Sequence, residues 1–360
     1  WDETLMIYII PGLAAFILAV VLTPLIIRLA RACKCLDVPG ARRLHKKITP
    51  RWGGVAFFAG VLPVMFYTNT GGFLTAYIVA SFLLVGIGIV DDHRTVGWKM
   101  KFAWMAVAVT IAIFGGDTTL HHLGTYGFLG RVDLGWLSIP FTYLCIIGVT
   151  NAINLLDGLD GLAGGVSLLG FLFMGIAAAN AGNVTIVFVC VAFVGALGGF
   201  LIYNFPNARV FMGDSGSTFL GFSLAFVAIS LTQHASSTVD VMFPVLVLLL
   251  PIFDTLWVIF VRLLNGKNPF LADNNHLHYL LIGKNVSPVV VVLLLWSFTV
   301  VFGGLALGLS GKTTSTYLAV VLNAILFLVL LASSLMRRRR EGSYKAFTVP
   351  PRQSVVIRGD

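Results

Sequence analysis

The chain has 360 residues, of which 58% are hydrophobic and 11% charged, and its mean hydropathy is +0.94. Soluble domains carry roughly 25% charged residues, so this composition excludes an ordinary soluble protein. The formal net charge of +9 would suit a nucleic-acid partner, but the basic residues are dispersed over short segments between long apolar runs. That distribution is typical of a membrane protein, and we expect no nucleic-acid partner.

A helix needs about 20 mostly apolar residues to cross a bilayer. About eleven stretches of the chain meet this requirement: 5–30, 53–70, 72–90, 102–116, 137–155, 163–180, 184–204, 217–233, 241–263, 287–309 and 315–336. The first stretch is too long for a signal-peptide core and lacks a clear small-residue cleavage site, so we interpret it as a retained helix. The sequence therefore predicts an all-α integral membrane protein, with one polytopic domain at 1–336 and a short basic tail at 337–360.

The positions of the basic residues predict how the chain is oriented. All Lys and Arg except Arg131 and Lys312 fall in 28–52, 91–101, 205–216, 262–286 and 337–360. Loops rich in Lys and Arg stay on the cytoplasmic side, which places the N-terminus outside and the C-terminus inside the cell. The same assignment puts the acidic motifs that contain Asp91, Asp157 and Asp214 on the cytoplasmic face.

Asp91 and Asp92 directly follow an apolar run, so they end a predicted helix at the membrane surface. Two adjacent carboxylates repel each other unless a proton or a cation intervenes, and Mg²⁺ prefers oxygen ligands of this kind. The alternative interpretation is a solvated helix end.

Asn151, Asn154, Asp157 and Asp160 recur at a spacing of three, so one face of a helix can carry most of them. A charge near the bilayer centre costs about 2.5–3.5 kcal/mol on insertion scales, so carboxylates kept beside a membrane span indicate a use. Amides and carboxylates together suit a polar ligand. The alternative is a turn-rich loop that caps the preceding helix.

The segment 204–217 presents Asp214 between Gly213 and Gly216. A tight glycine turn can present a carboxylate to a metal or a phosphate, whereas the alternative is that Asp214, with Ser215, caps the following helix. Phe211 in the same loop could stack on a base or anchor the loop at the membrane interface.

His276 and His278 are two residues apart, so they do not share a helical face and do not suggest a helical metal pair. In a loop they can donate hydrogen bonds to phosphate oxygens, and the alternative is two loop histidines without a function. Arg42, His45 and Lys47 in the first cytoplasmic loop can steer or contact an anionic substrate. The alternative for these three is contact with anionic lipid headgroups.

The motifs follow one another in a specific order. They are Asp-x-Pro-x-x-Arg-x-x-His at 37–45, Val-Asp-Asp at 90–92, Asn-Ala-x-Asn-x-x-Asp-Gly-x-Asp-Gly-Leu-Ala at 151–163, Phe-Met-Gly-Asp-Ser-Gly-Ser at 211–217 and Asp-x-x-His-x-His at 273–278. This ordered set resembles the polyprenyl-phosphate N-acetylhexosamine-1-phosphate transferases. The last two motifs look more like the members that use UDP-N-acetylglucosamine (UDP-GlcNAc) than like the muramyl-pentapeptide enzyme.

The resemblance implies an enzyme of the plasma membrane whose active site faces the cytoplasm. Undecaprenyl phosphate, or another polyprenyl phosphate, would attack the β-phosphorus of UDP-GlcNAc, giving polyprenyl-diphosphate-GlcNAc and UMP at the first membrane step of a cell-envelope polysaccharide pathway. UDP-GalNAc and UDP-MurNAc-pentapeptide are the alternative donors. The resemblance also implies Mg²⁺, with Mn²⁺ as an alternative, a fold of ten or eleven helices and a homodimer.

The resemblance gives roles to individual residues as well. Asp214 and Asp92 would bind the metal, and Asp91, beside the lipid phosphate, would be a candidate base. The residues expected to contact the substrates are Asn151, Asn154, Asp157, Asp160, Phe211 (stacked on uracil), His276, His278, His45, Arg42 and Lys47. Thr95 stands where many relatives carry a further acid, so no role can be given to that acid here.

Two other classes of protein compete with the transferase. A cation-coupled transporter would place acids near mid-membrane and often shows inverted repeats, but only Asp254 looks deep and no internal duplication is evident. A non-catalytic lipid-binding scaffold would not need several polar loops on one side. Asp254 and Asp273 receive no role from the sequence.

Overall fold

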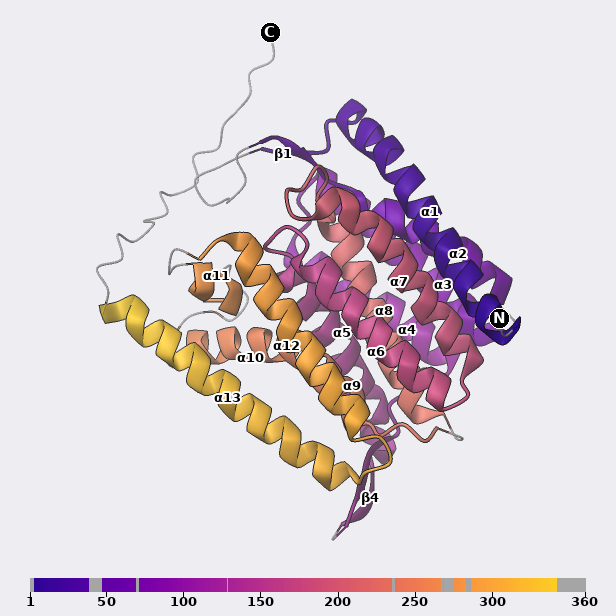
Figure 1. Ribbon diagram of the computed structural model, residues 1–360, viewed down its shortest axis with the longest axis vertical. Coiled ribbons are helices and arrows are strands. Elements are labelled where there is room, and N and C mark those ends of the chain that lie inside the picture. The colour runs from indigo at the N-terminus through magenta and orange to yellow at the C-terminus, as the bar shows by residue number, and fades with distance from the viewer. Residues whose placement is uncertain are drawn as a thin grey trace.

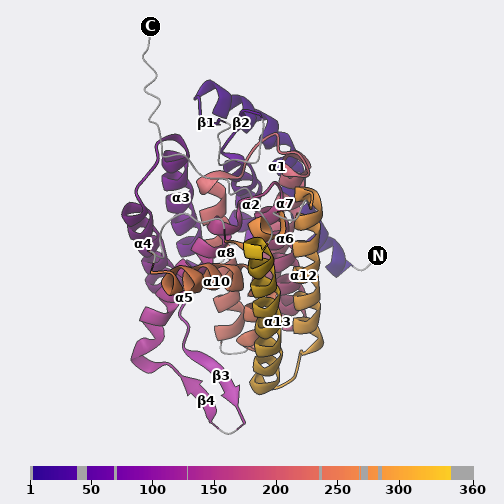
Figure 2. The same ribbon diagram turned by 90° about the vertical axis from the view of Figure 1, so that its left-hand side faces the viewer.

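The computed structural model describes residues 3–38, 47–68, 71–127, 129–234, 237–266, 268, 275–282 and 286–341. The elements in chain order are α1 Glu3–Ala32, β1 Leu36–Asp37, β2 Thr49–Pro50, α2 Gly53–Thr68, α3 Gly72–His93, α4 Trp98–Gly116, β3 His122–Tyr126, β4 Gly130–Asp133, the 3-10 helix η1 Gly135–Leu137, α5 Ser138–Leu156, α6 Leu162–Asn180, α7 Val184–Asn204, α8 Gly213–Gln233, α9 Met242–Val247, α10 Leu249–Leu264, α11 Leu277–Ile282, α12 Pro288–Gly308 and α13 Thr314–Glu341. Helices α1 and α13 lie at opposite edges of the molecule (Figure 1). The antiparallel pairs β1–β2 and β3–β4 lie at opposite ends of the helices (Figure 2).

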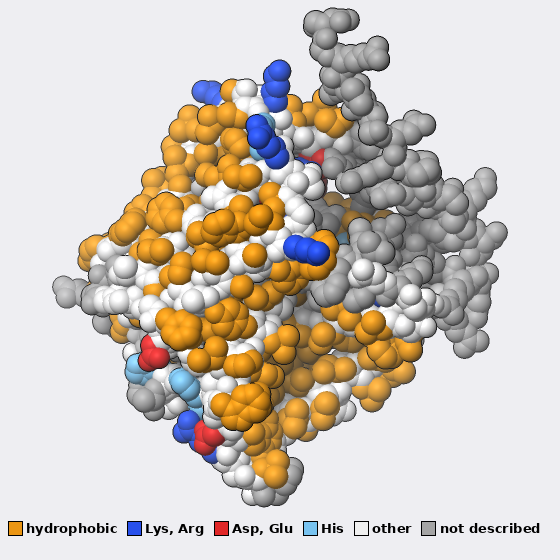
Figure 3. Space-filling model, turned by 180° about the vertical axis from the view of Figure 1, so that it is seen from behind, with side chains coloured by type: hydrophobic (Ala, Val, Ile, Leu, Met, Phe, Trp, Pro, Cys, Tyr) orange, Lys and Arg blue, Asp and Glu red, His pale blue; other side chains and the backbone are white. Residues whose placement is uncertain are grey.

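The long apolar helices confirm the predicted all-α membrane protein. Within the described residues, nine helices are long and apolar enough to cross a membrane, and α2, with 16 residues, is a shorter apolar helix. Apolar side chains spread over the face shown in Figure 3, and Lys and Arg gather toward its upper end. Helix α13 continues to Glu341, past the boundary predicted at 336.

The predicted single span at 241–263 is not one helix. The chain forms α9 and then α10, with the break at Leu248. Pro251 explains this break, because proline has no N–H and its ring clashes with the carbonyl four residues earlier, at Val247. Helix α10 then runs across the other helices in both ribbon views (Figures 1 and 2) and carries Asp254 in the interior, where that residue is 2% exposed.

Two helices begin earlier than predicted, and each includes a charged residue. Helix α4 begins at Trp98 rather than at 102, and α8 begins at Gly213 rather than at 217. Lys101 and Asp214 interrupt the apolar pattern in the sequence, but in the structure they lie near the starts of these helices and form an ion pair. An acidic residue in a first turn is also favoured by the helix dipole.

Helix α8 is the most deeply buried membrane-length helix among those described, and it packs against α2, α3, α5 and α6. Two glycines permit the close approach at its N-terminus. A Cβ at Gly54 of α2 would lie 2.1 Å from Gly216 Cα, and a Cβ at Gly88 of α3 would lie 2.3 Å from Ser215 Cα. The end of α3 that carries the adjacent carboxylates Asp91 and Asp92 therefore meets the start of α8.

Candidate active site

A cavity of about 1220 Å³ lies beside β1–β2. It is lined by parts of the first basic loop, the end of α3, the segments that follow α5 and α7, and α11. The lining includes Arg51, Asp92, Asp157, Asp214 and Tyr279. The structure thus brings together polar segments that the sequence assigned to one side of the membrane.

Lys101 of α4 lies between two carboxylates. Its ammonium Nζ contacts Asp91 Oδ2 and lies 3.2 Å from Asp214 Oδ2. Asp91 is 5% exposed, and its other oxygen accepts a hydrogen bond from the backbone N–H of Val96 at 2.5 Å. Two acidic side chains share one positive charge here, and of these two Asp214 lines the cavity, so the cluster favours a further cation.

Asp92 holds the start of α8. Its Oδ1 accepts a hydrogen bond from the backbone N–H of Asp214 at 2.8 Å, and its Oδ2 accepts from Ser215 N at 3.1 Å and Ser215 Oγ at 2.8 Å. The first N–H groups of a helix have no partner within the helix, so a carboxylate from α3 satisfies them. Asp92 borders the cavity and at the same time fixes the position of Asp214.

Asn154 of α5 also fixes Asp214. Its Nδ2 donates to Asp214 Oδ1 at 2.6 Å and to Ser217 Oγ at 2.8 Å. Asn151, one turn earlier on α5, is partly buried and is not among the described residues that line the cavity. The predicted polar face of α5 therefore reaches the site through Asn154.

The loop between α5 and α6 is tied to the segment after α7. Asp160 Oδ2 accepts from Ala208 N at 2.9 Å, and the side chain of Asn204 links Gly161 N at 2.8 Å to Val210 O at 2.9 Å. These bonds hold the Asp157–Asp160 loop at one wall of the cavity.

Asp157 is the other carboxylate of this loop, and no described residue donates to it a hydrogen bond of the kind seen at Asp160. Burial, followed by the charges of Asp214, Asp92 and Asp160, raises the pKa of Asp157 to about 7. A carboxyl group with such a pKa is neutral or ionised near neutral pH depending on what binds beside it.

The basic and aromatic residues predicted to contact substrate are placed as follows. Lys47 and Phe211 line the cavity, and the backbone of Phe211 bonds to Pro50 O and Gly53 N, each within 2.9 Å. Arg51 also lines it and bonds to Asp37 Oδ1 at 3.1 Å. Arg42 and His45 lie outside the described residues, as does Asp273.

The two predicted phosphate-binding histidines lie behind the cavity wall. His276 Nδ1 bonds to Asp254 Oδ2 at 2.7 Å, and His278 is fully buried against Gly158. Burial lowers the pKa of His278 to about 4, so its ring is neutral. The neighbouring Tyr279 does line the cavity, and burial, followed by the charge of Asp157, raises the pKa of its hydroxyl.

Three residues of the site were not found by sequence reasoning: Lys101, Asn204 and Tyr279. Lys101 gave a weak signal, since a lysine kept close to an apolar run needs a partner or water. Asn204 and Tyr279 gave none, because their partners lie far away in the sequence and no motif singles them out.

The residues present fit a magnesium ion that shares its coordination with substrate. Among the described residues, no group of three or more His, Cys, Asp or Glu side chains is arranged to hold a metal. Mg²⁺ commonly binds through one or two carboxylates together with substrate phosphates and waters. Asp91 and Asp214, which already surround the ammonium of Lys101, could supply these carboxylates, while both oxygens of Asp92 accept hydrogen bonds from α8.

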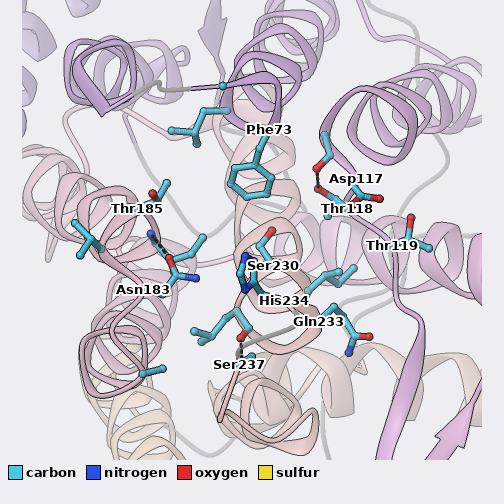
Figure 4. Close-up of a pocket in the computed structure, with 18 of the residues that line it drawn as sticks. Phe73, Asp117, Thr118, Thr119, Asn183, Thr185, Ser230, Gln233, His234 and Ser237 are labelled. Carbon is cyan, nitrogen blue, oxygen red and sulfur yellow. Dashed lines mark hydrogen bonds between the residues drawn. The ribbon is translucent and has the colours of Figure 1, made fainter.

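A second cavity of about 780 Å³ lies among the helix ends and turns on the β3–β4 side (Figure 4). Hydroxyl and amide side chains, including Asn183, Thr185 and Gln233, project around it. Asn183 Oδ1 accepts from Ile186 N at 3.1 Å, and Gln233 Oε1 accepts from His121 N at 2.9 Å. These side chains complete the backbone hydrogen bonding of turns and helix ends.

Comparison with known proteins defines the class. Residues 74–232 match the model of glycosyl transferase family 4. A Bacillus subtilis (strain 168) protein, named a probable undecaprenyl-phosphate N-acetylglucosaminyl 1-phosphate transferase, is 34% identical over 335 residues, which cover 92% of this chain and 93% of that protein. The decaprenyl-phosphate N-acetylglucosaminephosphotransferase of Mycobacterium leprae is 32% identical over 324 residues, 81% of each chain.

A more distant relative is the undecaprenyl-phosphate alpha-N-acetylglucosaminyl 1-phosphate transferase of Escherichia coli K12, 26% identical over 262 residues, 71% of each chain. Together with the nine membrane-length helices among the described residues, these matches define a multi-pass membrane transferase. More particularly, the chain belongs to glycosyl transferase family 4, the family of these relatives, and the resemblance drawn from its motifs is confirmed.

Proposed function

We propose that this enzyme transfers GlcNAc-1-phosphate from UDP-GlcNAc to undecaprenyl phosphate or another polyprenyl phosphate, giving the lipid-diphosphate sugar and UMP. The observation that carries the proposal is the cluster of Asp91, Lys101, Asp214 and Asn154 at the end of membrane-length helices. Relatives with such substrates in their names support the choice of acceptor and sugar.

The reaction exchanges one phosphoanhydride for another bond of the same kind. An oxygen of the polyprenyl phosphate bonds to the β-phosphorus of UDP-GlcNAc, while the bond from that phosphorus to the bridging oxygen breaks and this oxygen leaves with UMP. The acceptor phosphate is largely ionised near neutral pH, because the second pKa of a phosphate monoester is roughly 6. Its oxygen therefore needs no obligatory base, and the protein mainly positions groups and neutralises charge.

The residues of the cluster divide this work. The ammonium of Lys101 offsets the negative charge that accumulates when two phosphorylated substrates meet. Asn154 and the first turn of α8, held by Asp92, keep Asp214 in place. Such pre-formed contacts matter because a charge that is already oriented costs no reorganisation during the reaction.

We propose Mg²⁺, or Mn²⁺ in its place, as the cofactor. Asp214 and Asp91 would hold it, and Asp92 would support it through α8; direct ligation by Asp92 stays a prediction from the sequence. When bound, the ion would neutralise the diphosphate and polarise a phosphoryl oxygen. An ammonium already held by these two carboxylates supports the assignment, because the same pair attracts any cation.

The donor is assigned to the wall formed by the Asp157–Asp160 loop, Phe211 and the basic residues beside β1–β2. Phe211 would stack on uracil, and Arg51 and Lys47 would attract the diphosphate. The enzyme is placed in the plasma membrane with this cavity facing the cytoplasm, supported by the basic residues at the same end. A homodimer is proposed on the family resemblance alone.

The test is UMP release by purified, detergent-solubilised protein given undecaprenyl phosphate, Mg²⁺ and UDP-GlcNAc, UDP-GalNAc or UDP-MurNAc-pentapeptide. We expect release with UDP-GlcNAc only, and loss of release on adding EDTA. Release with another donor instead would mean that the enzyme transfers the sugar of that donor. No release with any donor, from folded protein in a suitable lipid, would overturn the proposal and return attention to a cation-coupled transporter.

A further inference from the structure

Asp254 has no place in the chemistry described above, yet both of its oxygens are engaged. Its Oδ2 lies 2.7 Å from His276 Nδ1, and its Oδ1 accepts a hydrogen bond from Leu277 N at 2.6 Å. Asp254 is 2% exposed and His276 is 3% exposed. Burying a carboxylate costs free energy unless its oxygens are paired. Here both partners, the His276 ring and the Leu277 N–H, belong to the His-x-His motif.

These two bonds fix the beginning of α11. Leu277 is the first residue of this six-residue helix, and its N–H has no partner within the helix. Asp254, from the crossing helix α10, supplies the acceptor. The bond to Nδ1 also selects the imidazole tautomer of His276 that carries its proton on that nitrogen.

Helix α11 in turn forms part of the wall behind the Asp157–Asp160 loop. A Cβ at Gly158 would lie 2.5 Å from His278 Nε2 and 3.2 Å from the hydroxyl oxygen of Tyr279. The rings of His276 and His278 lie nearly parallel, with centroids 5.6 Å apart. A displacement of α11 would therefore also displace the Asp157–Asp160 loop.

His278 cannot anchor this contact through hydrogen bonds of its own. Among the described residues, neither of its ring nitrogens has a hydrogen-bond partner, although the residue is fully buried. Burying an unpaired polar ring opposes this packing, so other contacts must hold it in place. The bonds from Asp254 and the buried side chains of Leu277 and Leu280 are available to do so.

We propose that Asp254 is a positioning residue for the nucleotide-sugar side of the active site. Through His276 and the start of α11 it holds His278 and Tyr279 against the Asp157–Asp160 loop. The inference rests on the proposed function, which assigns that loop to the UDP-sugar. The cluster of Asp91 and Lys101 lies on other elements and makes none of these contacts.

The test compares Asp254→Asn and Asp254→Leu with the wild-type enzyme. At metal sites, loss of a carboxylate that orients a histidine typically costs about 10- to 100-fold in activity, and Asp254 orients His276 in the same way. We expect a loss of this size in kcat/KM for UDP-GlcNAc in Asp254→Leu, carried mainly by KM, with KM for polyprenyl phosphate unchanged. Asp254→Asn keeps an acceptor for Leu277 N, so we expect a smaller rise in the same KM.

Thr255→Val is the matched control. Thr255 is the next residue of α10 and is similarly buried, and its hydroxyl has no hydrogen-bond partner within the part of the chain that the structure describes. We expect its KM values to equal those of the wild type. His276→Ala should reproduce the effect of Asp254→Leu, and the double variant should be no worse than either single variant, because residues of one unit are not additive.

Hydrogen exchange of the segment 276–282 gives a readout that does not depend on activity. We expect faster exchange in Asp254→Leu and wild-type exchange in Thr255→Val. Unchanged donor KM in both Asp254 variants, equal changes in donor and acceptor KM, or unchanged exchange would overturn the inference. If the wild-type enzyme itself does not use UDP-GlcNAc, the proposed function fails, and the exchange experiment still decides whether Asp254 anchors α11.

Discussion

The cavities at the two ends of the molecule share α3, α7 and α8 in their walls but hold different side chains. The cavity beside β1–β2 is lined by acidic and basic groups, and Lys101 links carboxylates of α3 and α8 beside it. At the opposite cavity, Asn183 and Gln233 bond to the backbone of nearby turns. In one cavity charged groups pair between helices, whereas in the other neutral polar groups satisfy backbone N–H groups.

This difference indicates which side chains serve catalysis and which serve the stability of the fold. Charges near a membrane are costly, and their accumulation at one end requires compensation by one another or by a ligand. Hydroxyl and amide groups that satisfy turns carry no such requirement. Substitutions at the charged end should therefore change catalysis, and matched substitutions at the other end should change stability alone.

The largest effect is expected for Asp214→Ala. Asp214, which three other residues hold in place, is one of the two carboxylates proposed to bind the metal, so its loss should weaken binding of the cation that neutralises the diphosphate. Loss of one element of such charge stabilisation typically lowers kcat by about 100- to 1000-fold. The measurement is UMP release under saturating substrates. Asp117→Asn, in the opposite cavity, is the control, because Asn tolerates the left-handed backbone found there (φ 49°). Wild-type turnover in folded Asp214→Ala would remove the metal-site argument.

Lys101→Met tests the cation between the carboxylates. The variant keeps the length of the side chain but leaves Asp91 and Asp214 without their shared ammonium. We expect kcat/KM to fall by about 10- to 100-fold, since truncating one member of a buried charge pair costs about 2–5 kcal/mol and Mg²⁺ can replace part of it. Lys99→Met, whose ammonium lies over the exposed ring of Trp98, is the matched control. Equal rates in the two variants would mean that Lys101 is not used.

Phe211→Ala should have a smaller and more selective effect. Stacking of a base on an aromatic ring contributes about 1–3 kcal/mol, so its loss should raise KM for UDP-GlcNAc by about 5- to 150-fold. KM for polyprenyl phosphate should not change. Phe211→Tyr keeps the ring and should restore the wild-type KM. A donor KM that is the same in the alanine variant would count against stacking.

The fold could be predicted where hydropathy alone determines the position of a helix. It could not be predicted where local backbone chemistry or residues distant in the sequence determine where a helix begins or breaks. The long helices follow from runs of apolar residues, but 241–263 is mostly apolar, and hydropathy does not show the break that Pro251 introduces. The predicted starts of α4 and α8 were too late, because Lys101 and Asp214 interrupt the apolar pattern and the sequence does not reveal that they pair with each other.

The site shows the same division. The acidic motifs pointed to carboxylates that line the cavity, because each of these residues belongs to a short contiguous motif that can be recognised in the sequence. His276 was predicted to contact phosphate, and this stays a prediction, but its partner in the structure is Asp254, 22 residues earlier. A pairing between a helix and a loop at this distance leaves no periodic signal in the sequence.

The pH dependence of stability offers a test that needs no substrate. The pKa of Asp157 is about 7 in the folded protein, whereas an exposed Asp titrates near about 3.9. The folded state therefore binds the proton more tightly, and this contribution to stability is present at low pH and lost as the pH rises from about 4 to about 7. Asp157→Asn removes it, so the melting temperature of the variant relative to wild type, measured in EDTA, should increase between about pH 5 and about pH 8. A constant difference would contradict the raised pKa.

The smallest effect is expected for Gln233→Ala at the opposite end. Its Oε1 accepts from the backbone N–H groups of His121 and His122, at 2.9 and 3.2 Å, and so ties α8 to the start of the β3–β4 hairpin. Because these donors are partly exposed, water can replace the amide, and the loss should be about 1 kcal/mol. Thermal unfolding should show a small decrease in melting temperature, while kcat and both KM values stay at wild type. A change in either KM would mean that the two ends are coupled through α8, whose first turn carries Asp214 and whose last turn carries Gln233.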